Sequence, residues 1–336
     1  MTELTVLLSC AGRRVELGEI FAKSGYRVIS ADADRTAPTL YTTSRGLLLP
    51  SVSTAPDAYT RSLLSIVGDE AVDVVVPLID PELPVLARMQ DALRAVGCMA
   101  NISSVPSVDA ASDKAATAGV FRQSGLKAPQ TEVIEGVLER DVETVSGFPT
   151  WPAVLKPRHG SAGKGIIHVP SREVALNALV VERPADYVLQ QQVIGDEITM
   201  DVFGDGSGRV VSVVQRQRLK IRGGEVERGV TVKIPQLFED AIALAAVFRP
   251  YGVINVQCFY DVHTGERWYT EINARFGGGY PLAYAAGADF PRYLASLVHG
   301  ETLTSLVGSD YSEGLCMMRY DHAVYMPSTK LVSPSN

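Results

Sequence analysis

Apolar and polar positions alternate in blocks along the first hundred residues, and these blocks predict strands and helices in turn. Short, mostly apolar runs are typical of buried strands, whereas segments that mix apolar and charged residues have the spacing of helices. Strands are expected at 4–10, 26–34 and 72–79, and helices at 14–24, 51–70 and 81–97. Apolar strands separated by helices predict a parallel sheet covered on both faces, as in a Rossmann-like α/β domain.

The pattern changes near residue 105. A helix is expected to end near Gly125, and short strands with one further helix then make a small α+β unit up to about residue 195. The chain is β-rich up to about residue 276 and helical after Pro281. We therefore predict an α/β domain at 1–108, a small sub-domain at 109–195, an antiparallel-sheet lobe at 196–326 and a polar, disordered tail at 327–336.

Composition narrows the class of protein. Of the 336 residues, 46% are hydrophobic and 21% charged, which is typical of a globular protein of two or three domains. No apolar run is long enough to span a bilayer, and the first residues lack the basic region of a secretory signal. The cysteines have no metal-ligand spacing, so we expect reduced thiols in a cytoplasmic protein. A net charge of −7 argues against nucleic acid or an anionic membrane as the partner, and we expect small molecules instead.

The first strand-to-helix turn, CAGRR, precedes the acidic stretch ADAD, as in half of a dinucleotide-binding fold. Only one glycine of that fingerprint is present. We therefore interpret Asp32 and Asp34 as turn residues and not as ligands of NAD.

Polar residues occupy one face of a predicted hairpin whose strands are 252–262 and 266–274. Its two apolar faces are expected to comprise Ile254, Val256, Cys258 and Tyr260 on the first strand and Trp268, Thr270, Ile272 and Ala274 on the second. A two-residue loop would spoil both faces. We therefore predict a three-residue loop, 263–265, that sets Gln257 directly opposite Glu271.

This register gathers Gln257, Glu271 and Asn273 on the other face of the hairpin. Amide and carboxylate oxygens are hard ligands that suit a Mg²⁺ ion which also holds substrate phosphates. Arg275 would lie beside that metal, where it could neutralise a transferring phosphoryl group. The alternative is the polar, solvated outer face of a sheet.

A glycine-rich loop follows a strand in VLKPRHGSAGKGI, residues 154–166. The strand delivers Lys156, and glycines in the loop would let backbone N–H groups approach phosphates closely. The spacing is not that of a P-loop, because Gly165 stands where Ser or Thr is required. We interpret the segment as a flap over phosphates, and the alternative is a plain hairpin turn.

The segment QQQVIGDE, 190–197, has the character of a linker between sub-domains. Its backbone could contact a purine edge, and Glu197 could accept hydrogen bonds from ribose hydroxyls. A generic turn is the alternative.

Four cations share one face of the strand VVSVVQRQRLKIR. They occupy alternate positions, Arg216, Arg218, Lys220 and Arg222, and would repel one another unless anions neutralise them. The face is either solvated or a wall that faces a triphosphate or a substrate carboxylate.

Taken in order, these motifs resemble the ATP-grasp superfamily, in particular the carbamoyl-phosphate synthetase large chain and its stand-alone relatives. The matching segments are SDK at 112–114, LKP at 155–157, QQQVIGDE at 190–197, NVQ at 255–257 and EINARF at 271–276. The first hundred residues look like the α/β domain that precedes the grasp. Gln191 departs from the glutamate that relatives often carry there. The length holds one grasp unit and no glutaminase domain, so a complete carbamoyl-phosphate synthetase is not expected.

The resemblance implies a role for each matching residue. ATP would be held by Lys114, Lys156, Ser161 and Gly163 at its phosphates, by Gln192 and Val193 at adenine, and by Glu197 at the ribose. One or two Mg²⁺ ions, or Mn²⁺, would be held by Gln257, Glu271 and Asn273. Arg275 would stabilise the transition state in which an acyl phosphate forms.

The resemblance therefore implies an ATP-dependent ligase that joins a carboxylate, expected to be amino-acid-like, to an amine. Substrate contacts are sought at the carboxyl end of a parallel strand and around the basic strand, at Asp80, Glu82, Arg216, Arg222 and Gly278. A homodimer is the default assembly. The alternatives are a cyclo-ligase, a bicarbonate-activating enzyme, a small-molecule kinase and a non-catalytic nucleotide sensor.

Overall fold

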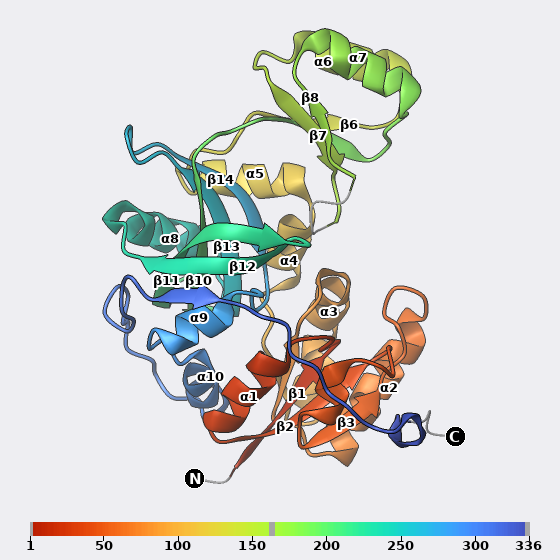
Figure 1. Cartoon of the computed structure of the whole chain (residues 1–336), viewed down its shortest axis with the longest axis vertical. Coiled ribbons are helices and arrows are strands. Elements are labelled where there is room, and N and C mark those ends of the chain that lie inside the picture. Colours follow the sequence, from red (N-terminus) through yellow and green to blue (C-terminus); the bar gives the residue numbers. More distant parts are fainter. Residues whose placement is uncertain (1–2, 161–164, 333–336) are drawn as a thin grey trace.

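The structure, a computed structural model, describes residues 3–160 and 165–332. Its strands form three sheets, which follow one another along the chain from the N-terminal domain to the small sub-domain and the large lobe (Figure 1). No helix among the described residues is both long and apolar enough to cross a bilayer.

The N-terminal domain is built on a five-stranded parallel sheet with the strand order β3-β2-β1-β4-β5, which confirms the predicted α/β class. The strands are β1 (Leu4–Ser9), β2 (Tyr26–Asp32), β3 (Arg45–Leu48), β4 (Val74–Pro77) and β5 (Met99–Ala100), and the helices are α1 (Val15–Lys23), α2 (Pro56–Asp69) and α3 (Leu83–Ala95). Alternate strand residues pack on opposite faces. Val6 and Leu8 join α1 in one core, and Leu7 joins α2 and α3 in another.

The small sub-domain stands at one end of the molecule (Figure 1). Its antiparallel sheet, in the order β6-β9-β7-β8, is covered by two helices. The elements are β6 (Thr131–Ile134), α6 (Leu138–Gly147), β7 (Ala153–Pro157), β8 (Ile167–Val169), α7 (Arg172–Val181) and β9 (Tyr187–Gln191). Its core contains Phe148, Leu155 and Leu189 and is separate from the other two, so this unit is a distinct body on the lobe.

The lobe contains a six-stranded antiparallel sheet in the order β14-β13-β10-β11-β12-β15. Its strands are β10 (Asp196–Asp205), β11 (Val210–Arg222), β12 (Glu225–Val232), β13 (Tyr251–Tyr260), β14 (Arg267–Asn273) and β15 (Cys316–Met318). The helices of this region are α4 (Val105–Ser112), α5 (Lys114–Gln123), α8 (Pro235–Phe248), α9 (Tyr280–Ala285) and α10 (Phe290–Val298). The predicted antiparallel lobe is therefore confirmed.

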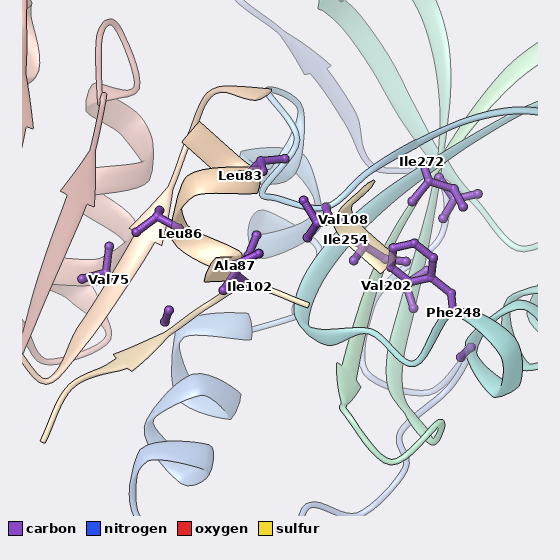
Figure 2. Close-up of a cluster of buried hydrophobic side chains, with 14 of the residues drawn as sticks. Val75, Leu83, Leu86, Ala87, Ile102, Val108, Val202, Phe248, Ile254 and Ile272 are labelled. Carbon is purple, nitrogen blue, oxygen red and sulfur yellow. The ribbon is translucent and has the colours of Figure 1, made fainter. Parts of the chain in front are cut away.

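One continuous hydrophobic core ties the N-terminal domain to the lobe. Figure 2 shows Leu83 and Leu86 of α3 on one side and Val202, Ile254 and Ile272 of the lobe sheet on the other. All five side chains are at most 3% exposed. Because this interface is apolar and buried, it fixes the carboxyl ends of the N-terminal strands against the polar face of the lobe.

The β13–β14 hairpin has the predicted pairing but not the predicted loop. Gln257 lies opposite Glu271, as expected, but the strands pair up to Tyr260 and Arg267 and leave six residues between them. The registers agree because Thr270 is an extra residue in β14, a β-bulge. The predicted apolar face of the second strand is therefore partly wrong. Beyond the bulge, Tyr269 is the residue buried in the core, in place of Trp268 and Thr270.

The expected disordered tail, 327–336, falls partly on described residues. Ser328–Lys330 form a 3₁₀ turn, and the Val332 N–H donates to the Tyr41 hydroxyl at 3.1 Å. Residues 333–336 lie outside the described part. In Figure 1 the segment after β15 returns along the N-terminal domain.

Candidate active site

A cavity of about 680 Å³ lies where the three units meet. Its walls come from the carboxyl end of β4, the start of α5, the end of β7 and the polar face of the lobe sheet. Ten residues selected from the sequence line it: Asp80, Lys114, Lys156, Glu197, Arg216, Gln257, Glu271, Asn273, Arg275 and Gly278. The polar hairpin face is therefore a wall of this cavity and not the outside of a sheet.

The proposed metal ligands adjoin one another on this wall. Glu271 pairs with Gln257, and Asn273 pairs with Asn255 in the adjoining register. One carboxylate and two amide oxygens fit a hard divalent cation that takes its remaining ligands from phosphate and water. The donor set therefore fits Mg²⁺, and these three side chains would hold it.

The charge of the Glu271 carboxylate acts on three cations that line the same cavity. Its negative charge raises the pKa of Lys114, Lys156 and Arg275. Burial nevertheless outweighs this effect at Lys156 and lowers the pKa of its ammonium group to about 8, and burial lowers the pKa of Lys114 as well. Two desolvated lysines beside the candidate metal ligands would suit a polyanionic phosphate.

Lys114 is fixed by the turn that precedes it. Asp113 caps α5 by accepting from the Ala115 N–H at 2.9 Å, and its carboxylate binds the Arg158 guanidinium through two hydrogen bonds of 2.9 and 2.6 Å. The Lys114 ammonium donates to the Gly160 carbonyl at 2.8 Å. The start of α5 and the start of the glycine loop are thus joined, while the expected ligands Ser161 and Gly163 lie outside the described residues.

The adenine contacts remain a prediction. Gln192 and Val193 follow β9 but are not among the described residues that line the cavity. The Gln192 N–H donates to the Pro152 carbonyl at 3.0 Å. Glu197 does line the cavity, where its carboxylate forms an ion pair with Arg218.

Each cation of the basic strand has an acidic partner within the protein. The pairs are Arg216 with Asp201, Arg218 with Glu197, Lys220 with Glu227, and Arg222 with Asp321 and Glu227. Only Arg216 and Arg218 of the four are cavity-lining residues in the described chain. The proposed contact of Arg222 with substrate is therefore corrected, because this half-exposed side chain is paired at the surface.

Arg216 is a buried structural residue beneath a second glycine-rich segment, residues 277–279. It is 2% exposed and binds Asp201 at 2.6 and 3.0 Å, and the Asn255 amide donates to the same carboxylate at 2.9 Å. A Cβ at Gly279 would lie 2.0 Å from its Nη1 atom, and one at Gly277 would lie 2.5 Å from the Asn255 amide nitrogen. The loop needs glycine because buried side chains fill the space beneath it.

Arg275 is held by the N-terminal domain. Its guanidinium binds Asp80 through two bonds of 2.7 and 3.0 Å, and Nη2 lies 3.4 Å from the Asn273 amide oxygen. Burial alone would lower the pKa of Arg275, but Asp80 and Glu271 outweigh it and raise the pKa. A planar fork held at two points keeps one orientation, so Asp80 positions Arg275 beside Asn273, one of the candidate metal ligands.

Glu82 does not line the cavity, which corrects its expected contact with substrate. Its carboxylate is fully buried and accepts hydrogen bonds from Ser9, Tyr59 and the backbone N–H groups of Leu78 and Ile79. Glu82 is therefore a buried structural residue just beyond the carboxyl end of β4. Asp32 likewise accepts from the Gly12 N–H at 2.8 Å, as a turn residue does.

Sequence reasoning missed two of the charged residues that line the cavity. Arg14 follows β1, and its guanidinium lies 3.2 Å from Glu225, at the start of β12. Arg14 could have been found, because it follows the carboxyl end of a parallel strand, where open α/β sheets bind ligands. Glu225 carries no comparable signal.

Two families match this chain. Residues 6–101 match "PylC-like, N-terminal domain", and residues 183–313 match "ATP-grasp in the biosynthetic pathway with Ter operon".

Curated relatives are similar over part of their length. The chain is 26% identical over 218 residues to the mitochondrial methylcrotonoyl-CoA carboxylase subunit alpha of Oryza sativa subsp. japonica, a match that covers 57% of this chain and 28% of that protein. It is 27% identical over 180 residues to phosphoribosylamine–glycine ligase of Mycobacterium tuberculosis, covering 51% and 40%. The chain thus matches less than half the length of either relative.

Among solved structures, the biotin carboxylase domain dimer of Hydrogenobacter thermophilus 2-oxoglutarate carboxylase, in complex with MgADP, ADP and bicarbonate, has a TM-score of 0.74 at 14% identity. The alignment covers 94% of this chain and 74% of that one, and shows a shared fold. The matched families and the three sheets agree: this chain has a PylC-like N-terminal domain at residues 6–101 and an ATP-grasp domain at residues 183–313.

Proposed function

We propose that this protein is an ATP-dependent ligase that activates a carboxylate as an acyl phosphate and transfers the acyl group to an amine. One observation carries the proposal: Lys114, Lys156 and Arg275 line the same cavity as Glu271, whose negative charge acts on all three. Such a site has groups that phosphoryl transfer needs, which are cations and oxygen ligands that could hold a metal.

Each group of side chains would have a separate role in the reaction. Lys114 and Lys156 would bind the phosphates of ATP, and the substrate carboxylate would attack the terminal phosphorus with ADP as the leaving group. Mg²⁺, when bound by Gln257, Glu271 and Asn273, would neutralise charge on the phosphates and orient them. Arg275, oriented by Asp80, would stabilise charge on the transferring group. An amine would then displace phosphate and form the amide.

The test is ADP release with Mg·ATP and a panel of carboxylic acids in the presence of hydroxylamine. A hydroxamate from one acid would establish an acyl phosphate. We expect Glu271→Ala to lower the rate by about 10²-fold or more, equivalent to about 3 kcal/mol. The matched control is Glu266→Ala, which removes an exposed acid paired with Lys127 at the far end of the same hairpin. Equal rates in the two variants would refute the assignment of Glu271.

A second candidate reaction is the activation of bicarbonate. The match to a carboxylase subunit over 57% of the chain favours it, and the catalytic groups would be the same. Transfer of label from [¹⁴C]bicarbonate to an acid-stable product would identify this reaction, whereas an amide of the expected mass would identify the ligase.

The metal count, assembly and location are also proposals. One or two Mg²⁺ ions fit a face with a single carboxylate, and Mn²⁺ would be an acceptable substitute. We propose a homodimer, to be tested by light scattering, because paired assemblies are the commonest closed symmetry. A cytoplasmic location is supported by the four free cysteines.

A further inference from the structure

An arginine that follows the last strand reaches the wall of the cavity from outside. Arg319 comes directly after β15 and begins a segment, residues 319–332, that returns along the N-terminal domain (Figure 1). We refer to this segment as the strap. Arg319 is not among the described residues that line the cavity, but its guanidinium contacts Gly278 and Glu225, which both line it. The mechanism above gives Arg319 no role.

Both the backbone and the side chain of Arg319 are anchored. Its backbone N–H donates to the Glu227 carbonyl at 2.9 Å, which continues the pairing of β15 with β12. Its Nη1 atom lies 3.4 Å from Glu225 Oε2. Its Nη2 atom donates to the Gly278 carbonyl and lies 3.7 Å from the Glu16 carboxylate of α1. One planar group therefore contacts the lobe sheet, the glycine segment 277–279 and the N-terminal domain.

The Gly278 carbonyl depends on this arginine. The carbonyls on either side of it, in the segment 277–279, accept from the backbone N–H groups of Tyr280 and Leu282, both at 3.1 Å. Within the described ranges, Arg319 is the one donor to the Gly278 carbonyl. Because a backbone carbonyl that loses its partner must find another, and because a peptide unit is planar, loss of Arg319 would free the whole unit to turn.

The segment 277–279 needs such support from outside. Three successive glycines give the backbone more conformational freedom than any other residue type would. The side chains of Arg216 and Asn255 lie beneath the segment and would clash with a Cβ there, but neither donates to its carbonyl groups. The segment also begins two residues after Arg275 and lines the same cavity. Movement of these glycines would therefore change the cavity wall beside Arg275.

The exposure of the ion pairs indicates a local role for Arg319 and not a global one. The side chains of Arg319, Glu225 and Glu16 are 25, 40 and 56% exposed. Ion pairs between such exposed groups contribute little to the stability of a fold. The hydrogen bond to a carbonyl in the cavity wall is the contact of Arg319 that has no substitute.

We propose that Arg319 is a positioning residue, which acts from the strap by fixing the Gly278 peptide group in the cavity wall. The effect on turnover rests on the proposed ligase function, because the glycine segment adjoins Arg275. The effect on the mobility of the glycine segment does not depend on that function.

The first experiment measures hydrogen exchange in the free protein at the backbone N–H groups of Tyr280 and Leu282, which are bonded to the glycine segment. We expect exchange to be about tenfold faster or more in Arg319→Gln, because the segment opens more often. The matched control is Arg222→Gln, which removes an exposed pair of 2.7 Å with Asp321 of the strap and should exchange like the wild type. Equal exchange rates in the two variants would overturn the proposal.

The second experiment measures carboxylate-dependent ADP release and the affinity for a non-hydrolysable Mg·ATP analogue. Arg319→Gln should lower kcat by about tenfold or more and leave the Kd of the analogue within about twofold, because Arg319 contacts neither Lys114 nor Lys156. A loss of affinity as large as the loss of kcat would show a general structural effect and overturn the proposal.

A further variant separates the carbonyl bond from the contact with the N-terminal domain. Glu16→Gln removes the acidic partner on α1 and keeps the bond to Gly278, so it should have the kcat of the wild type. If Glu16→Gln lowered kcat as much as Arg319→Gln, Arg319 would act as a bridge between domains and the proposal would fail.

The two experiments also separate this inference from the ligase function. Faster exchange in Arg319→Gln, with no hydroxamate formed from any acid by the wild type, would keep Arg319 as the residue that fixes Gly278 and overturn the ligase. Unchanged exchange in Arg319→Gln, with hydroxamate formed by the wild type, would keep the ligase and overturn the role of Arg319.

Discussion

Lys156 gives the cavity a pH dependence that can be measured. Its ammonium group has a pKa of about 8 instead of 10.5, because burial destabilises the charged form more than the negative charge of Glu271 stabilises it. A lysine that binds phosphate must be protonated. The protonated fraction is about 90% at pH 7, about half at pH 8 and about 10% at pH 9. We therefore expect the affinity of the free protein for Mg·ATP to fall about tenfold per pH unit above pH 8.

The assay is equilibrium binding of Mg·ATP between pH 6.5 and 9.5 without the other substrates, so that no substrate amine titrates. In Lys156→Arg the guanidinium stays charged throughout this range, so the decline above pH 8 should disappear even if overall binding is weaker. Lys127→Arg replaces an exposed lysine and should keep the wild-type profile. A wild-type profile that is flat to pH 9.5 would refute the assignment of Lys156 as the titrating phosphate ligand.

The same shift predicts a cost in stability. The unfolded chain holds the Lys156 proton up to a pKa near 10.5 and the folded protein only up to about 8, so between these values the unfolded state binds more protons. Stability contributed by this residue therefore rises as pH rises through that window. At pH 7 the buried charge costs about 3 kcal/mol. Lys156→Met should be more stable than the wild type in urea at pH 7, and this gain should vanish near pH 10.5.

Three further predictions concern groups around the cavity. Asp113→Asn should raise the KM for ATP about tenfold, because it weakens the bond to Arg158 that joins the start of α5 to the start of the loop 158–165. The control, Asp109→Asn, loses an exposed pair with Arg88 and should leave the KM unchanged. Equal KM values in the two variants would contradict the role of Asp113. Asp201→Asn should lower the free energy of unfolding by about 3–5 kcal/mol, measured in urea, since it leaves the buried Arg216 charge uncompensated. Glu135→Gln, in the exposed pair with Arg140, is its control, and similar midpoints in the two variants would argue against the buried pair. Gly279→Ala should destabilise the folded protein by about 1–3 kcal/mol, because a Cβ would clash with Arg216. Gly119→Ala should stabilise it, because this helical position has open space around it. Thermal melts that rank the two variants in the reverse order would refute the packing argument.

The fold followed from the sequence where local patterns carry the information. Apolar runs in the first hundred residues predict buried parallel strands, because both faces of such a sheet are covered and nothing in the run need be polar. Asn273 and Glu271 on alternate positions likewise predict one polar face, because side chains of a strand alternate. Both predictions use only neighbouring residues.

The hairpin loop shows where local reasoning failed. A three-residue loop explained the pairing of Gln257 with Glu271, but Asp261 stabilises a longer loop by accepting from the N–H groups of His263 and Thr264. That side-chain turn was not recognised. The bulge at Thr270 then restores the pairing. The longer loop and the bulge offset each other, so Gln257 still lies opposite Glu271.

The residues that line the two ends of the cavity differ in how far apart they lie in the chain. This difference explains which end could be predicted from the sequence. Lys114, Lys156 and Glu271 each lie within a short motif, because a phosphate or metal site needs a few donors that one turn or strand can supply. At the other end, ion pairs join Arg14 to Glu225 and Asp80 to Arg275, and the partners in each pair are far apart in the chain. No spacing rule links them. Because these pairs form only when the domains dock, a change in the hydrophobic interface between α3 and the lobe should disturb the two ion pairs before it disturbs Lys114, Lys156 and Glu271.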